Sequence, residues 1–179
     1  MAETADFAAN RRQAEDAGLL GGGDYLKHQE GANRLRLLTM CLAHPSTYKG
    51  ERTFKWLCYV IDRRDGKVKP YFMPHKIYKA IEGLQQDPDY AFVSVPMPYD
   101  LNVNAENAGK MTVKYTVIPA KKETPVTAEE LAQLAKMKPL RELHETLREK
   151  ARKERERTDS QAGDTDFDSS ALENELEEA

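Results

Sequence analysis

The chain has 179 residues, of which 32% are charged and 8% aromatic, and this length fits one domain with extensions. Two cysteines are too few for a disulfide framework, and no window approaches the roughly 18 apolar residues that a membrane-spanning helix needs. The composition therefore excludes disulfide-stapled scaffolds and membrane-spanning proteins. The first 18 residues contain no apolar run long enough for a signal peptide, so we expect a soluble, cytosolic protein with reduced thiols.

Charge is unevenly distributed along the chain, although the formal net charge is only −3. Residues 24–122 carry 16 basic and 10 acidic side chains, whereas residues 158–179 carry eight acidic side chains and no basic one. A basic middle segment followed by a wholly acidic end is typical of a polyanion-binding surface with a separate interaction tail.

Residues 1–24 are expected to form an N-terminal arm. A short, weakly amphipathic helix is expected over residues 4–18, and the glycine run Gly21–Gly23 favours a hinge after it. The folded core is then expected to begin near Tyr25.

Five strands are expected in the core, with one helix after the third strand. The strands are indicated by alternating or β-branched sequence, and the Asp65-Gly66 pair predicts a hairpin between the second and the third. In chain order the expected elements are strands Arg34–Thr39, Phe54–Asp62 and Lys67–Met73, a helix from Pro74 that ends before Asp87, and strands Tyr99–Asn104 and Met111–Ile118. The polar segment 43–53 is expected to be a loop. This order predicts a mainly β protein with helices, built on a five-stranded OB-fold barrel over residues 25–122.

The chain after the barrel is expected to form a helical extension over residues 123–157. Thr127 and Glu130 form a capping-box pattern that predicts a helix start, and Pro139 breaks or restarts that helix. Residues 158–179 bury too little apolar surface to offset the entropy of ordering, so a disordered acidic tail is expected. Its few apolar groups among acids predict docking on a partner, with a purely solubilising tail as the alternative. The expected partner-binding residues are Asp166, Phe167, Asp168, Leu172 and Leu176.

Strand alternation predicts which core side chains point outward. If Leu35, Leu37, Val68, Phe72, Val113 and Val117 fill the barrel, basic residues and tyrosines on the same strands are exposed. Lysine and arginine neutralise phosphates, and aromatic rings stack on unpaired bases. The expected DNA-binding residues are Arg34, Arg36, Tyr48, Lys49, Arg52, Lys55, Trp56, Tyr59, Arg63, Arg64, Lys67, Lys69, Tyr71 and Lys114. The alternative is an ordinary solvated face with its rings packed in the core.

Metal binding and catalysis are weaker interpretations of the same residues. Cys41 and His44 have the spacing of half a zinc knuckle, but no second short-spaced pair accompanies them. Cys58 and His75 would have to supply the other ligands. A nuclease-like cluster of Asp62, Asp65 and Asp100 is more simply a set of turn and strand-end residues. We therefore expect no metal, no cofactor and no enzymatic activity.

Several short stretches together resemble the phage single-stranded DNA-binding proteins, the helix-destabilising protein family of T-even phages. They span about 100 of the 179 residues, in order. The stretches are Tyr25–Lys27, Glu30–Leu38, Phe54–Lys69, Met73–Lys79, Asp87–Tyr90, Val113–Pro119 and Thr124–Thr127.

The resemblance implies an OB-fold, cooperative binding to single strands during replication, recombination or repair, and an acidic tail that recruits replication proteins. It also implies a location in the cytoplasm of the infected bacterial host. The T-even members carry a zinc subdomain with a Cys-x-x-Cys pair and a basic N-terminal arm. This chain has no such pair, and its residues 1–23 have only Arg11 and Arg12 against four acidic residues.

We therefore expect a monomeric or weakly self-associating protein that binds single-stranded DNA with little sequence preference. Two other classes remain open: an RNA-binding regulator, and a protein-interaction adaptor with weak nucleic-acid binding. Binding to oligo-dT separates the first expectation from the adaptor, and a comparison of dT with rU separates it from the RNA-binding regulator.

Overall fold

The computed structural model describes residues 25–48 and 51–162, so the predicted N-terminal arm, Lys49 and the predicted partner-binding residues lie outside it. The chain is mainly β with helices, as the sequence predicts. The strands are β1 (Gly31–Leu37), β2 (Leu42–Tyr48), β3 (Glu51–Asp62), β4 (Lys67–Met73), β5 (Leu101–Glu106) and β6 (Lys114–Pro119). The helices are α2 (His75–Gln86), α3 (Ala128–Lys136) and α4 (Leu140–Ala162).

The strands form one antiparallel sheet that is organised by the long strand β3. The sheet runs in the order β2-β3-β1-β5-β6, and β4 also pairs with β3. β1 and β2 pair in succession with β3, at its residues 60–62 and 51–57. Among the described strands β4 and β6 are not paired, so the sheet is open. The predicted five-stranded barrel is thus corrected to an open six-stranded sheet.

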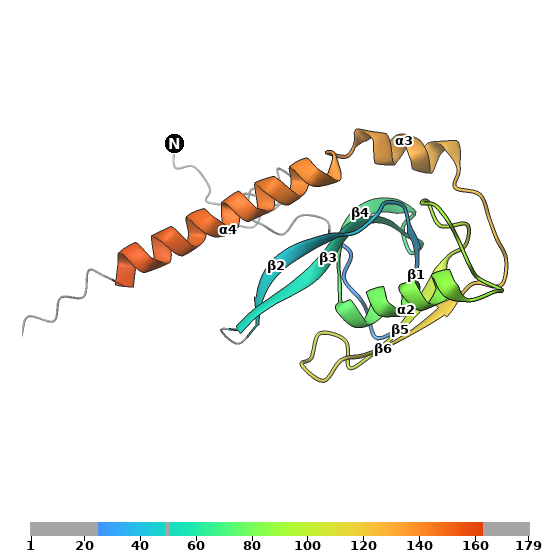
Figure 1. Cartoon of the computed structure of the whole chain (residues 1–179), viewed down its shortest axis with the longest axis horizontal. Coiled ribbons are helices and arrows are strands. Elements are labelled where there is room, and N and C mark those ends of the chain that lie inside the picture. Colours follow the sequence, from blue (N-terminus) through green and yellow to red (C-terminus); the bar gives the residue numbers. More distant parts are fainter. Residues whose placement is uncertain (1–24, 49–50, 163–179) are drawn as a thin grey trace, which may run out of the picture. The chain divides into compact units, whose positions relative to one another are not determined.

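The sixth strand comes from the segment that was predicted to be a loop. Every residue from Leu42 to Tyr48 has a partner on β3, including Pro45, which lies opposite Phe54. The residues of β3 before Trp56 have no partner on β4. β2 and β3 therefore run together as a two-stranded ribbon, which Figure 1 shows extending away from β1 and β4. The segment of β2 is polar and contains Pro45, so its sequence is typical of a loop and does not predict a strand.

The core lies between the concave face of the sheet and α2. Ile77 and Ile81 of α2 are buried, which confirms the predicted apolar stripe of this helix. They pack with buried side chains from β1, β3, β4 and β5. The core cluster also includes Leu35, Leu37, Cys58, Val60, Tyr71, Met73, Met97, Tyr99, Leu101 and Val103.

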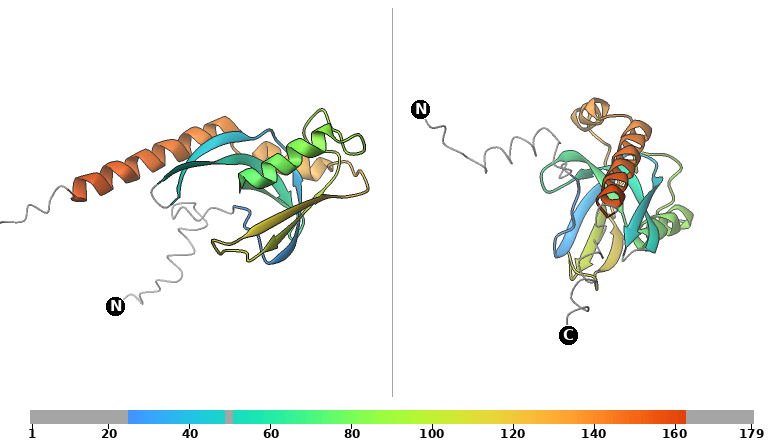
Figure 2. Two further views of the ribbon diagram at one scale, coloured as in Figure 1. Left: turned by 60° about the horizontal axis from the view of Figure 1, so that its bottom comes forward. Right: turned by 90° about the vertical axis from the view of Figure 1, so that its left-hand side faces the viewer.

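The inward and outward faces of β4 are the reverse of those predicted. Tyr71 and Met73 point into the core, whereas Val68 lies on the opposite face, across from Ile61. Both faces of this strand are covered, because α2 packs on one side and α3 on the other (Figures 1 and 2). Alternation alone cannot identify the outward face of a strand that is covered on both sides.

The gap between β4 and β6 is filled by the extended segment 25–30. The Leu26 amide donates to the Pro70 carbonyl oxygen at 2.9 Å. The ring of His28 lies between those of Tyr71 and Tyr115, at centroid distances of 5.4 and 5.1 Å. One backbone hydrogen bond and several ring contacts therefore bridge the place where a closed barrel would have a full backbone ladder.

The C-terminal part of the chain is helical, as predicted. Thr127 and Glu130 form the expected capping box at the start of α3. α4 extends to Ala162, beyond the predicted end of the helical extension at Arg157. The chain divides into two compact units, residues 1–141 and 142–179. Within the described ranges, no helix has the length and apolarity that a membrane span requires.

Candidate nucleic-acid interface

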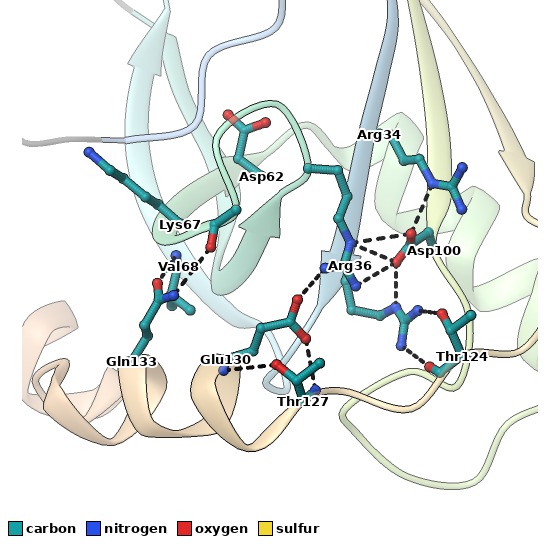
Figure 3. Close-up of polar contacts among 12 residues, drawn as sticks. Arg34, Arg36, Asp62, Lys67, Val68, Asp100, Thr124, Thr127, Glu130 and Gln133 are labelled. Carbon is teal, nitrogen blue, oxygen red and sulfur yellow. Dashed lines mark hydrogen bonds and ion pairs between the residues drawn. The ribbon is translucent and has the colours of Figure 1, made fainter.

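Asp100 gathers three arginines at the end of the sheet, two of which were predicted to point outward (Figure 3). Its carboxylate accepts hydrogen bonds from Arg34 Nε at 2.9 Å, from Arg36 Nε at 2.7 Å and from Arg63 Nη2 at 3.1 Å. Burial favours a higher pKa for Asp100, but the hydrogen bonds from Arg63 and Arg34 and the charge of Arg36 lower it. The carboxylate is therefore ionised and anchors the cluster.

Arg36 is buried, so the prediction that it lies on an exposed DNA-binding face is wrong. Its side chain has 0% exposure, and its guanidinium also donates to the carbonyl oxygens of Met97 and Thr124 at 3.1 and 2.7 Å. Arg34 differs, because 54% of its side chain is exposed beside Asp100. Of the two arginines on β1, only Arg34 remains accessible to a phosphate.

A second carboxylate, Asp62, holds the basic residues of the β3–β4 turn. Arg64 Nη2 lies 2.6 Å and Lys69 Nζ 3.1 Å from Asp62 Oδ2, and Lys69 also pairs with Asp65 at 2.6 Å. Burial would raise the pKa of Asp62, but the hydrogen bonds from Arg64 and Lys69 lower it to about 2. Lys69 is buried, which corrects its predicted exposure, whereas Lys67 is exposed.

The tyrosines of the predicted groove are buried too. Tyr71 is 1% exposed, and its hydroxyl lies 2.6 Å from His28 Nε2. Tyr59 is 2% exposed, and its hydroxyl donates to the Lys138 carbonyl oxygen at 2.8 Å. Neither ring is available for stacking on a base, so the predicted outward position of Tyr71 is wrong. The predicted site on β3 and β4 is thus not one open surface.

A partly exposed aromatic cluster lies instead between the β2–β3 ribbon and the start of α2. Phe54 and His75 are exposed, whereas Trp56 and Tyr78 are half-buried and pack against the core. Trp56 stacks on Tyr78, with ring centroids 3.9 Å apart and planes 12° from parallel. The Trp56 indole N–H donates to His75 Nδ1 at 3.1 Å. Phe54 contacts both Trp56 and His75 edge-on and is 43% exposed. We call Phe54, Trp56, His75 and Tyr78 the aromatic cluster.

Cations flank the aromatic cluster on both of its elements. Arg52 shares strand parity with Phe54 and Trp56, so it lies on the same face of the ribbon. Lys79 lies four residues after His75, on the same side of α2. Arg52, Lys55, Lys76 and Lys79 are all exposed, with Lys55 on the opposite face of the ribbon. Such a surface can stack bases and neutralise the phosphates next to them.

The other predicted site residues are distributed over the molecule. Arg64 and Lys114 are exposed, Arg63 is partly buried, and the side chain of Tyr48 lies outside the described part of the chain. The sequence pattern predicts Arg52, Lys55 and Trp56 as site residues but does not identify Phe54, His75, Tyr78 and Lys79 as members of the same site. The signal was present, because alternation at 52, 54 and 56 is followed by helical spacing at 75, 78 and 79.

Among the residues considered for zinc, the Cys41 and Cys58 thiols lie close together, but the two histidines have other partners. Cys58 lies in the core, with its thiol near the Tyr71 carbonyl, while His75 accepts the Trp56 indole and His44 contacts the Phe72 ring. Over residues 25–48 and 51–162, no group of three or more His, Cys, Asp or Glu side chains has metal-binding geometry.

No protein-family model, curated protein or solved structure matches the chain.

Proposed function

We propose that the chain binds single-stranded nucleic acid, DNA in the first place, with little sequence preference and without catalysis. The observation that carries this proposal is the partly exposed aromatic cluster flanked by Arg52 and Lys79. Every base has a π-face, so stacking tolerates any sequence, and each stacked base contributes about 1–3 kcal/mol. Double-stranded nucleic acid hides those faces, so the cluster favours single strands.

The order of elements supports an open version of the OB-fold as the scaffold. β1 and β2 pair in succession with β3, as one bent strand of a barrel would. β3 and β4 form a hairpin, α2 follows, and β5 returns to pair with β1 before β6. In proteins with this fold, oligonucleotides bind on a strand surface and the adjoining loops.

The resemblance to phage helix-destabilising proteins supports a role in phage DNA replication, recombination or repair within the infected host. In this proposal the acidic tail, with Phe167, Leu172 and Leu176, recruits replication proteins. Residues 158–179 carry eight acidic and no basic side chains, so the same tail repels DNA.

Fluorescence of Trp56 during titration with oligo-dT tests the proposal directly, because the chain has one tryptophan. A base that stacks in the cluster changes the surroundings of the Trp56 indole, so we expect its emission to change in parallel with binding. An oligo-rU titration under the same salt conditions distinguishes DNA from RNA preference. Absence of binding to either oligomer at moderate salt would contradict the proposed function.

Paired substitutions test the position of the site. Phe54→Ala should weaken oligo-dT binding about tenfold or more, because it removes an accessible stacking ring. The double variant Arg52→Ala/Lys79→Ala should reduce the salt slope of log K by about 1.4, for two lost phosphate contacts. Lys121→Ala/Lys122→Ala is the matched control, since it removes two exposed positive charges elsewhere. Equal effects of the two double variants would contradict this site.

A further inference from the structure

The segment that follows β6 crosses the face of the sheet opposite the core. Thr124 accepts hydrogen bonds from Arg36, and the Lys138 carbonyl accepts one from the Tyr59 hydroxyl. Between these points, Gln133 of α3 accepts from the Val68 amide at 3.1 Å and donates to the Gly66 carbonyl at 3.3 Å. We call residues 124–138 the strap.

Polar contacts hold the central part of the strap. No residue of α3 is buried, and Leu131 is 45% exposed. The helix start is independently stabilised by the Thr127–Glu130 capping box, so α3 does not need the sheet in order to begin. A helix attached mainly through side-chain hydrogen bonds and one ion pair can detach as a unit.

The ion pair in the strap joins Glu130 to Arg63. Arg63 also contacts Asp100, which it shares with Arg34 and Arg36, and 23% of its side chain is exposed. Three guanidinium groups therefore face two carboxylates. Glu130 offers Arg63 one carboxylate oxygen, Oε1, while its Oε2 accepts from the Thr127 amide. A nucleic-acid phosphate would offer Arg63 the same kind of anionic acceptor.

We propose that Arg63 is a phosphate subsite that Glu130 masks, and that a bound single strand displaces Glu130 and lifts α3 from β4. This inference rests on the proposed function, because the displacing phosphate belongs to the single strand that binds the chain. The strap is thus an autoinhibitory contact: its release accompanies binding and exposes the polar edge of the β3–β4 turn. The exchange breaks no covalent bond and replaces one carboxylate by one phosphate.

Glu130→Gln removes the competing charge and keeps the capping box, in which Gln serves as well as Glu. We expect about five- to tenfold tighter oligo-dT binding than in the wild type. The salt slope should rise by about 0.7, because Arg63 then carries a counterion that the phosphate releases. Glu129→Gln is the matched control, with the same charge change on the same helical turn. Arg63→Ala should abolish the gain from Glu130→Gln.

The outcomes separate this inference from the proposed function. If Glu130→Gln leaves oligo-dT affinity at the wild-type value, the masked subsite alone is overturned. The same holds if Glu129→Gln strengthens binding as much as Glu130→Gln does. Absence of binding in every variant overturns the proposed function and the inference with it.

Hydrogen exchange of the Val68 amide reports on strap release in the full chain, since Gln133 is its acceptor. Saturating oligo-dT should accelerate Val68 exchange while amides in the β1–β5 ladder stay protected. Unchanged or slower Val68 exchange in the complex overturns the lifting of α3.

Discussion

At the scale of single residues, the most consequential feature is the buried charge of Arg36. Arg36 is fully buried and depends on Asp100, which lies 64 residues later in the sequence and is itself 4% exposed. Removing one partner of a buried pair leaves the other charge without compensation, which is far more costly than losing an exposed pair. The arginine-rich β1 strand therefore contributes to stability through Arg36 and offers only Arg34 to a ligand.

Asp100→Asn should lower the free energy of unfolding by about 3 kcal/mol, because Arg36 keeps its charge and loses its carboxylate. Urea denaturation at pH 7 measures this. Asp89→Asn is the control, since Asp89 is exposed and makes no ion pair among the described residues. A difference between the two variants below about 1 kcal/mol would contradict the structural role of Asp100.

At the scale of elements, α3 combines a well-formed start with weak attachment to the sheet. Thr127 stabilises the first turn by accepting from the Glu130 amide at 3.2 Å, and the same Glu130 side chain reaches Arg63. The geometry of the helix start is therefore coupled to the ion pair. Loosening the first turn should loosen the strap without affecting the core.

Thr127→Ala should destabilise α3 locally by about 1 kcal/mol through loss of the cap. We expect faster exchange of the Val68 amide and an unchanged urea midpoint for the core. Thr146→Ala on α4 serves as the comparison, because that threonine lies within a helix and not at its start. If Val68 exchange responds equally to both substitutions, the cap does not control the strap.

The sequence predicted those elements that depend on local signals. The β3–β4 hairpin followed from Asp65-Gly66, α2 from its helical spacing, and α3 from its capping box. β2 was missed, because Pro45 and its polar neighbours resemble a loop unless the facing strand is known. The aromatic cluster was missed for the same reason, since it forms only when the ribbon meets α2. The burial of Lys69 and Tyr71 was missed because local alternation carries no information about what covers each face.

At the scale of the whole molecule, the free energy of unfolding should depend on pH just below neutrality, and the group responsible is His28. Burial first, and the nearby charge of Arg64 second, lower the pKa of His28 to about 4. The folded protein therefore disfavours the proton that the unfolded chain accepts near pH 6.5. Stability contributed by neutral His28 is complete above about pH 6.5 and is lost as the pH falls toward 4. Asp62, with a pKa of about 2, continues the loss at lower pH.

Urea midpoints measured between pH 7 and pH 5 should fall for the wild type, in a range where carboxylates scarcely titrate. His28→Gln should flatten this dependence, because glutamine keeps a polar contact for Tyr71 and takes up no proton. The full loss for the wild type by pH 4 should be about 2 kcal/mol after allowance for solvent screening. Identical pH profiles for the two proteins would contradict the assignment to His28.

The filled gap between β4 and β6 has a mechanical consequence. Elsewhere the strands are joined by backbone ladders, which resist sliding because each shift breaks several hydrogen bonds at once. At this seam the rings of His28, Tyr71 and Tyr115 meet through contacts that tolerate small displacements. The molecule is therefore stiffest across β3 and most compliant at its seam. The wedge in that seam, residues 25–30, directly follows the N-terminal arm segment, so tension applied through that end of the chain would widen the sheet before it unzips a strand.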